Sequence, residues 1–275
     1  MASDRASNGG DYDEGFWREF LTRGRSMERR ARRVLKHIPS DPRCRLCAAP
    51  FAGPGAPVMR LIGKRPAEQN PNVCRICFTF LSSHHGGAEI DLTMLFADIR
   101  GSTTLAEGMS TDGFRRLLDR FYTTASEVVF ADDGMVDKFV GDELVAIFSP
   151  LLTGKRHAIK GVEAARDLLR ATGHLEPAGP WVPLGVGVHT ARTWFGAVGR
   201  GGRVELTAVG DAVNTTARLA SLAAAGEILV TIEAATAAAL DLGSLDRQQL
   251  ELRGKHHPIE VVRLRVGPAD SIAAA

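Results

Sequence analysis

Hydrophobic and polar positions alternate in short segments along most of the chain, and beyond residue 88 they predict strands and helices that follow one another. The predicted strands span 90–99, 135–140, 143–148 and 227–231, with a glycine-rich strand pair over 183–199 and a last hairpin over 248–266. The predicted helices span 110–134, 157–171, 211–223 and 233–240. This alternation indicates one mixed domain over 87–268, followed by a flexible tail over 269–275.

Two local signals define the clearest elements. Ser110 has the residue type of a helix N-cap, an apolar stripe with helical spacing follows it, and Gly134 supplies a stop. Only Gly141 and Asp142 separate the strands at 135–140 and 143–148, which is the spacing of a tight hairpin. The side chain of Asp142 is therefore expected at the tip of a turn, away from both strand faces.

The amino-terminal part of the chain has a different pattern. A helix is predicted over 16–38 after a polar tail, and together they make up the predicted segment 1–43. The basic side chains of this helix are Arg18, Arg23, Arg25, Arg29, Arg30, Arg32, Arg33 and Lys36. Such a face is most often the solvated side of a docking helix, and its charge leaves nucleic acid, an acidic partner or an anionic membrane as alternatives.

Composition narrows the class of protein. The chain has 275 residues, of which 44% are hydrophobic and 24% charged, so it can bury a core and is neither disordered nor collagen-like. Residues 1–90 carry 15 basic and 9 acidic side chains, whereas the rest carry 19 and 23, which indicates two modules. No apolar run approaches the roughly 18 residues of a membrane span, and the polar start lacks a leader pattern. We therefore expect a soluble, cytoplasmic protein without a membrane partner.

Four cysteines form two C-x-x-C pairs in a loop-dominated segment, 44–86, that is rich in Pro and Gly. Cys44 and Cys47 are separated by 26 residues from Cys74 and Cys77. Two such knuckles supply a closed tetrahedral shell of four thiolates, which favours a structural Zn²⁺ in a zinc-ribbon-like module. An iron–sulfur cluster also suits four thiolates, and the alternatives without metal are two unrelated thiol pairs or two reversible disulfides. Haem attachment is excluded because Phe78 follows Cys77.

Two carboxylates stand at positions that suit a metal and phosphate site. Asp98 lies near the end of a predicted strand, and the small, hydroxyl-bearing turn of Gly101, Ser102 and Thr103 follows it, where backbone amides can hold phosphate. Asp142 lies in the tight turn, and two such carboxylates can bridge a pair of divalent cations. Each carboxylate alone is typical of a solvent-facing loop, so the interpretation depends on the motifs that accompany them.

Four motifs follow one another along the larger domain. They are DIRGST at 98–103, KFVGD at 138–142, GVGVHT at 185–190 and TAVGDAVNTTAR at 207–218. In this order and spacing they resemble the class III nucleotidyl cyclases, the adenylate and guanylate cyclases, over about residues 88–266. The resemblance implies a ferredoxin-like α/β catalytic domain, of the α+β class, that acts as a homodimer with its site at the interface.

The resemblance also implies roles for individual residues. Asp98, Asp142 and the Ile99 carbonyl match the groups that hold two Mg²⁺ or Mn²⁺ ions in this family. The implied phosphate-binding residues are Gly101, Ser102, Thr103 and, in the last hairpin, Arg253, where Lys255 is the alternative.

Four further residues match positions that contact the base and the transition state. Lys138 and Thr207 match the pair that binds the purine. An ammonium group donates to the unprotonated N1 of adenine and is repelled by the N1–H of guanine, so this pair favours ATP. Asn214 and Arg218 lie four residues apart, on one face of a helix, and match the ribose-orienting and transition-state residues. Thr at position 207 resembles the class IIIb subset, for which bicarbonate responsiveness is a hypothesis.

The sequence therefore predicts an adenylate cyclase, a signalling lyase that converts ATP to 3′,5′-cyclic AMP and pyrophosphate. The alternatives are a nucleotide-binding regulatory protein without turnover and a guanylate cyclase. A nucleic-acid-binding role depends only on the basic amino-terminal part and is not favoured.

Overall fold

The computed structural model describes residues 14–23, 30, 32, 34–40, 42–200, 204–252, 255 and 257–266. The chain divides into two compact units. The smaller unit is Met1–Ile90 with Trp194–Ala208, and the larger is Asp91–Thr193 with Val209–Ala275. The hydrophobic pattern gave no sign that Trp194–Ala208 groups with the amino-terminal residues, because contacts between distant segments leave no periodic signal in the sequence.

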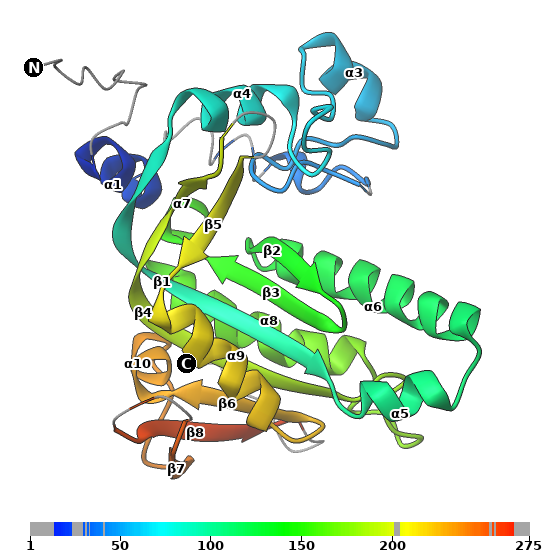
Figure 1. The fold of residues 1–275 in the computed structure, drawn as a ribbon, viewed down its shortest axis with the longest axis vertical. Coiled ribbons are helices and arrows are strands. Elements are labelled where there is room, and N and C mark those ends of the chain that lie inside the picture. The colour runs from blue at the N-terminus through cyan, green and yellow to red at the C-terminus, as the bar shows by residue number, and fades with distance from the viewer. Residues whose placement is uncertain are drawn as a thin grey trace, which may run out of the picture. The chain divides into compact units, whose positions relative to one another are not determined.

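The larger unit is built on a mixed sheet with the strand order β2-β3-β1-β4-β6-β8-β7 (Figure 1). β4 and β6 are parallel, whereas the pairs β1/β3, β2/β3, β6/β8 and β7/β8 are antiparallel. The strands are β1 (Gly86–Ile99), β2 (Met135–Val140), β3 (Glu143–Phe148), β4 (Leu184–Val198), β6 (Glu227–Thr231), β7 (Asp246–Leu250) and β8 (Ile259–Arg265). This arrangement confirms the predicted mixed fold of strands and helices.

Helices cover both faces of this sheet. They are α5 (Ser102–Glu107), α6 (Thr111–Ala131), α7 (Pro150–Thr153), α8 (His157–Ala171), α9 (Asp211–Leu222) and α10 (Ile232–Ala237), with a 3₁₀ turn at Gly154–Arg156. Thr93 of β1 lies against α8, since a Cβ on Gly161 would approach its side chain to 2.6 Å. The next residue, Met94, accepts a weak hydrogen bond from Thr216 of α9 at 4.0 Å. Successive strand residues point to opposite faces, so α8 and α9 lie on opposite sides.

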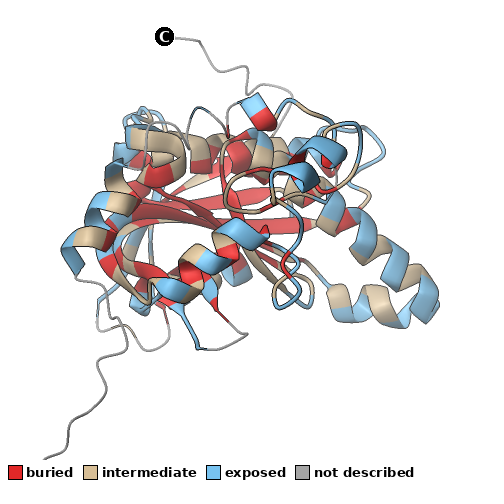
Figure 2. Ribbon diagram, turned by 90° about the horizontal axis from the view of Figure 1, so that it is seen from above, coloured by how far each residue is buried: buried red, intermediate tan, exposed pale blue. Residues whose placement is uncertain are grey.

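The main hydrophobic core lies between the sheet and the helices α6, α8 and α10. Leu95, Ala97, Phe121, Phe148 and Leu168 belong to it and are almost completely buried. A smaller cluster on the α9 side contains Leu219, Ala223, Leu229, Leu252 and Val261. Figure 2 shows the buried residues concentrated on the central strands, while the helices carry the exposed ones on their outer sides. This core fixes the strand ends at which the candidate site residues stand.

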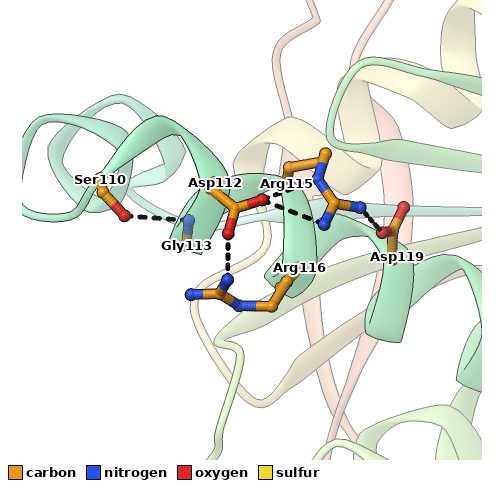
Figure 3. Close-up of polar contacts among 6 residues, drawn as sticks. All are labelled: Ser110, Asp112, Gly113, Arg115, Arg116 and Asp119. Atoms are coloured by element: carbon orange, nitrogen blue, oxygen red, sulfur yellow. Dashed lines mark hydrogen bonds and ion pairs between the residues drawn. The ribbon is translucent and has the colours of Figure 1, made fainter.

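The structure confirms the predicted helix at 110–134 and its cap. α6 begins at Thr111, and the Ser110 hydroxyl accepts a hydrogen bond from the Gly113 amide at 3.1 Å. The first two turns carry ion pairs from Asp112 to Arg115 and Arg116, and from Arg115 to Asp119 (Figure 3). These exposed pairs contribute little to the free energy of unfolding, so the helix depends on its apolar face.

One predicted element differs from the structure. The strand pair expected over 183–199 is wrong, because β4 is one continuous strand. Gly185 and Gly187 lie within this strand and allow α9 to approach, since a Cβ on Gly185 would lie 2.4 Å from Ala223 O and a Cβ on Gly187 would lie 2.6 Å from Ala220 N. Gly86 and Gly87, which lie before the predicted strand at 90–99, already belong to β1.

The other predicted elements of the larger unit agree closely with the structure. The hairpins β2/β3 and β7/β8 are present in the predicted positions. The helix expected at 233–240 begins one residue earlier and ends at Ala237. β5 (Glu205–Val209), which pairs with β4, was not predicted. Short strands of this kind lack enough alternating positions to be distinguished from a loop.

The smaller unit contains three described helices, α1 (Glu14–Arg23), α3 (Ala56–Leu61) and α4 (Arg75–Ser83). Trp17 is fully buried and donates its indole N–H to the His85 carbonyl at 3.3 Å. Phe20 and Phe80 pack together with ring centroids 4.9 Å apart. The segment that was expected to consist mainly of loops therefore contains two helices, α3 and α4.

Only part of the predicted helix at 16–38 lies among the described residues, and positions 24–29, 31 and 33 fall outside them. Arg32 corrects the prediction of a solvated basic face. Its side chain is buried, and its guanidinium donates to the carbonyls of Arg45 and Leu46 at 3.0 and 2.9 Å. Arg32 thus stabilises the first cysteine knuckle. Within the described part of the chain, no helix combines the length and apolar character that crossing a membrane requires.

Candidate nucleotide site and four-cysteine cluster

The structure brings Asp98 and Asp142 together at one end of the β1/β3 pair. Asp98 is the penultimate residue of β1 and lies opposite Glu143 in the antiparallel register. The Ile99 amide is 3.4 Å from the Asp142 carbonyl oxygen. Gly141 adopts φ 61° in the two-residue turn, a conformation that favours glycine. Carboxylate and carbonyl oxygens are the ligands that Mg²⁺ and Mn²⁺ prefer, so this donor set fits divalent cations.

Arg100 is a residue of this site that the sequence analysis missed. Its guanidinium forms an ion pair with the Asp98 carboxylate and donates to the Ser221 carbonyl, near the end of α9, at 2.6 Å. Burial lowers the pKa of Arg100, and the charges of Asp142 and Glu143 oppose that change. Arg100 therefore connects the carboxylate end of β1 to α9. Its position two residues after Asp98 was the only sequence signal.

Glu143 and Tyr122 define the surroundings of the turn. Burial raises the pKa of Glu143, the negative charge of Asp142 adds to the effect, and Arg100 opposes it. The Tyr122 hydroxyl donates to the Gly141 carbonyl, and its ring stacks on Phe139 with centroids 4.0 Å apart. Burial raises the pKa of Tyr122, so this hydroxyl stays protonated as a donor. Tyr122, a residue of α6, thus fixes the turn that carries Asp142.

The predicted phosphate-binding residues follow Asp98 directly. Gly101 adopts φ 67°, precedes α5, and its carbonyl accepts from the Leu105 amide at 2.9 Å. Ser102 is half-buried and Thr103 is exposed at the start of that helix. Arg253 lies outside the described residues. Its alternative, Lys255, forms an ion pair with Asp211 at the start of α9.

The two predicted base-binding residues lie in different units, and each is described within its own unit. Lys138 lies on β2 opposite Val145, and its side chain is 42% exposed. Its ammonium nitrogen lies 3.4 Å from the Asp137 carboxylate. Thr207 lies on β5 and is buried.

Asn214 and Arg218 share a helix, as the sequence predicts. Both belong to α9, four residues apart, where Asn214 is exposed and Arg218 half-buried. Residues four apart on a helix project from the same face, so the two side chains can act on one ligand. α9 packs against β6, which fixes this face relative to the sheet.

The four cysteines form one cluster in the smaller unit. Their sulfur atoms all lie within 4.8 Å of one another, and the Cys47 and Cys74 sulfurs are 3.7 Å apart. All four thiols are free, so the alternative of two disulfides does not describe this structure. A Zn–S bond of about 2.3 Å gives tetrahedral S–S edges of about 3.8 Å, which agrees with the observed separation. An iron–sulfur cluster distributes its four thiolates over two or more irons, so four sulfurs this close to one another fit a single ion better.

The surroundings of the cluster suit a negatively charged thiolate centre. The Cys44 sulfur accepts from the backbone amides of Cys47 and Cys74 at 3.5 and 3.2 Å. The Lys64 ammonium lies 3.8 Å from the Cys47 sulfur. Such second-shell donors orient the ligands of a metal and balance their charge. Lys64 had not been singled out from the sequence, where it is an ordinary surface cation.

Comparison with known proteins places this geometry in a family. Residues 88–264 match the adenylate and guanylate cyclase catalytic domain. The chain belongs to this family of class III nucleotidyl cyclases, as the motifs indicated. It is 37% identical over 134 residues to the terminal-differentiation-specific adenylate cyclase of Dictyostelium discoideum. That match covers 48% of this chain and 6% of the relative, so the chain spans a small part of that protein.

Solved structures agree on the fold. The guanylyl cyclase Cya2 superposes with a TM-score of 0.59 at 22% identity, covering 69% of this chain and 98% of that one. The adenylyl cyclase CyaB from P. aeruginosa superposes with a TM-score of 0.54 at 25% identity, covering 63% and 92%. The mixed fold is therefore that of class III cyclases. Adenylyl and guanylyl cyclases both occur among these neighbours, so the fold does not define the base.

Proposed function

We propose that the chain is an adenylate cyclase that converts ATP to 3′,5′-cyclic AMP and pyrophosphate. The observation that carries the proposal is the adjacency of Asp98 and Asp142 at one end of the β1/β3 pair, beside the Gly101 turn. Two carboxylates next to a phosphate-binding turn suit a nucleoside triphosphate with its divalent cations. The family adds the reaction class, a nucleotidyl cyclisation.

In this proposal Asp98, Asp142 and the Ile99 carbonyl hold two Mg²⁺ or Mn²⁺ ions. When bound, such ions lower the pKa of the ribose 3′-hydroxyl and neutralise charge on the triphosphate. The turn formed by Gly101, Ser102 and Thr103 binds phosphate oxygens through amides and hydroxyls, and Arg253 contributes a cation. The Arg100 guanidinium already contacts the Asp98 carboxylate. When the divalent cations bind, Arg100 is displaced from this carboxylate or remains beside it as a further positive charge.

The face of α9 completes the proposed reaction. Asn214 orients the ribose so that its 3′-oxygen is in line with the α-phosphate, and Arg218 offsets the negative charge that develops on that phosphate. The bond from the 3′-oxygen to phosphorus forms as the bond to pyrophosphate breaks, without a covalent intermediate on the enzyme. Class III cyclases are commonly dimeric, and we propose a cytoplasmic homodimer in which each site takes residues from both copies.

Lys138 and Thr207 select adenine in this proposal, so the purified protein with excess Mn²⁺ is expected to form cyclic AMP from ATP and little cyclic GMP from GTP. An ammonium donor to adenine N1 contributes about 1.5 to 3 kcal/mol, or roughly tenfold to a hundredfold in preference. Lys138→Glu should therefore reduce the ratio of kcat/KM for ATP to that for GTP by this factor. Product chromatography with each nucleotide measures it.

Lys155→Glu is the matched control, because Lys155 is an exposed cation of the same unit. It should leave the ratio unchanged. Cyclic GMP as the main product of the unmodified protein would support the guanylate cyclase alternative, which the likeness to Cya2 keeps open. Nucleotide binding without either product would support the regulatory alternative.

We also propose that the cysteine cluster holds one structural Zn²⁺, since four protein ligands leave no position for substrate. Lys64→Met is expected to weaken zinc binding by about tenfold to a hundredfold, the usual effect of losing a second-shell partner. Competition with a chromophoric chelator measures the affinity. Arg60→Met removes an exposed cation from the same module and should bind zinc normally. Equal affinities in the two variants would contradict the role of Lys64.

A further inference from the structure

The four-cysteine cluster and the segment that carries Thr207 belong to the same compact unit. That unit is made of Met1–Ile90 and Trp194–Ala208. The second segment includes the end of β4 and most of β5, the strand on which Thr207 stands. The cysteine module, to which we assign no role in the reaction itself, is thus packed together with Thr207, which we assign to binding of the base.

The first connection runs through α4 into the sheet. Cys74 is the N-cap of α4, Cys77 lies in its first turn, and β1 begins three residues after the helix ends at Ser83. The connecting turn is held on both sides, because the His84 amide donates to the Phe80 carbonyl at 3.0 Å and Trp17 donates to the His85 carbonyl at 3.3 Å. Movement of the second cysteine knuckle is therefore transmitted to the start of β1.

The start of β1 is packed against the end of β4 without free space. A Cβ on Gly196 would lie 2.3 Å from the Gly86 carbonyl oxygen, and a Cβ on Gly87 would lie 2.5 Å from the Trp194 ring. Such distances show that the two backbones touch, so neither strand can shift without the other. Phe195, between these contacts, is fully buried. β4 continues from here toward β5.

A second connection reaches the start of β5 from the loop between the knuckles. The Asn70 side-chain amide donates to the Val204 carbonyl at 3.5 Å, three residues before Thr207. Asn70 also accepts from the Asn72 amide at 3.1 Å, and the Asn72 carbonyl accepts from the Arg45 amide, within the first knuckle, at 2.9 Å. The Val204 side chain is completely buried. The second knuckle is thus linked to the end of β4, and the first knuckle to the start of β5.

We infer that the ion in the four-cysteine cluster holds the end of β4 and β5, and with them Thr207, in place for nucleotide binding. Metal–sulfur bonds join the two knuckles, so removal of the ion frees each knuckle and the contacts that depend on it. The occupancy of the cluster then sets the affinity for the adenine base. The role of Thr207 and the presence of the ion rest on the proposed function, whereas the contacts that lead from the cysteine knuckles to β5 do not.

Hydrogen exchange of the full chain tests the connection without any use of activity. We expect the Val204–Ala208 amides to exchange at least about tenfold faster after a chelator has removed the metal, because they lose a local anchor. The β6 amides, Glu227–Thr231 in the larger unit, should exchange as before and serve as the internal reference. Unchanged exchange at Val204–Ala208 with the metal removed would overturn the inference, as would an equal increase in β6.

Asn70→Ala tests the same connection with the metal in place. The variant should retain its zinc, show faster exchange at Val204–Ala208, and have a higher KM for ATP with a smaller change in kcat. Gln69→Ala, an exposed neighbour, should match the unmodified protein in all three. Normal exchange at Val204–Ala208, both in Asn70→Ala and in the protein without metal, would refute the inference. It would not affect the proposed cyclase function. Faster exchange in a protein that forms no cyclic nucleotide would refute the proposed function alone.

Discussion

Asp98→Asn and Asp142→Asn are each expected to reduce turnover by at least about 10³-fold, because each removes a carboxylate that the proposal assigns to the divalent cations. The amide keeps the shape of the side chain but loses the charge that a hard cation requires. Both carboxylates lie near the end of the β1/β3 pair and not in the main core, so the fold should persist. Cyclic AMP formation and thermal unfolding measure the two effects separately.

Asp119→Asn provides the matched control. Asp119 lies on α6 with a side chain that is 62% exposed, and it pairs only with Arg115 among the contacts drawn in Figure 3. Its loss should leave turnover within about twofold, as expected for an exposed ion pair. Mn²⁺ titration by calorimetry adds a readout that does not depend on turnover, and it should show weaker binding in both site variants. Full activity in either site variant would remove that carboxylate from the mechanism.

Arg218→Ala is expected to lower kcat by about 10² to 10³-fold, with a much smaller change in KM. The reason is that a charge placed for the transition state contributes little to binding of the ground state. Initial rates over a range of ATP concentrations separate the two constants. A rise in KM at normal kcat would instead make Arg218 a substrate-binding residue.

Two further variants make the interpretation of Arg218 sharper. Arg218→Lys keeps the positive charge but loses the planar fork, so it should recover only part of kcat. Arg116→Ala, which removes an exposed cation of α6, should retain full activity. If Arg116→Ala lost as much activity as Arg218→Ala, the effect would be one of overall charge and not of a positioned guanidinium.

Much of the larger unit follows from local sequence signals. Helix α6 has its cap at Ser110, and the Gly141-Asp142 turn joins β2 to β3, since both depend on residues close together in the chain. The wrong prediction at β4 arose because a local signal was used where a tertiary contact decides the structure. The glycine-rich segment 183–199 is predicted from local sequence as two strands, although the tertiary contact with α9 is what requires Gly185 and Gly187.

The motifs identified the main residues of the candidate site, but they did not identify the residues that support them. Arg100 lies within the DIRGST motif without a predicted role, and Tyr122 lies in no motif, so only their contacts with Asp98 and Gly141 identify them as supporting residues. Arg32 was assigned to a solvated face for the same reason, although its buried guanidinium binds the first cysteine knuckle. A side chain's partner across the fold cannot be inferred from its own neighbours in sequence.

The sequence by itself determined the family, the order of the main strands and helices, and the grouping of the four cysteines into one set that could hold a metal. These features are encoded in hydrophobic periodicity, turn residues and motif spacing, which act over a few residues. Only the tertiary structure decided that Trp194–Ala208 packs with the cysteine module and that Asp98 meets Asp142 and Arg100. Those contacts arise from close packing between distant segments, and packing depends on the whole folded chain.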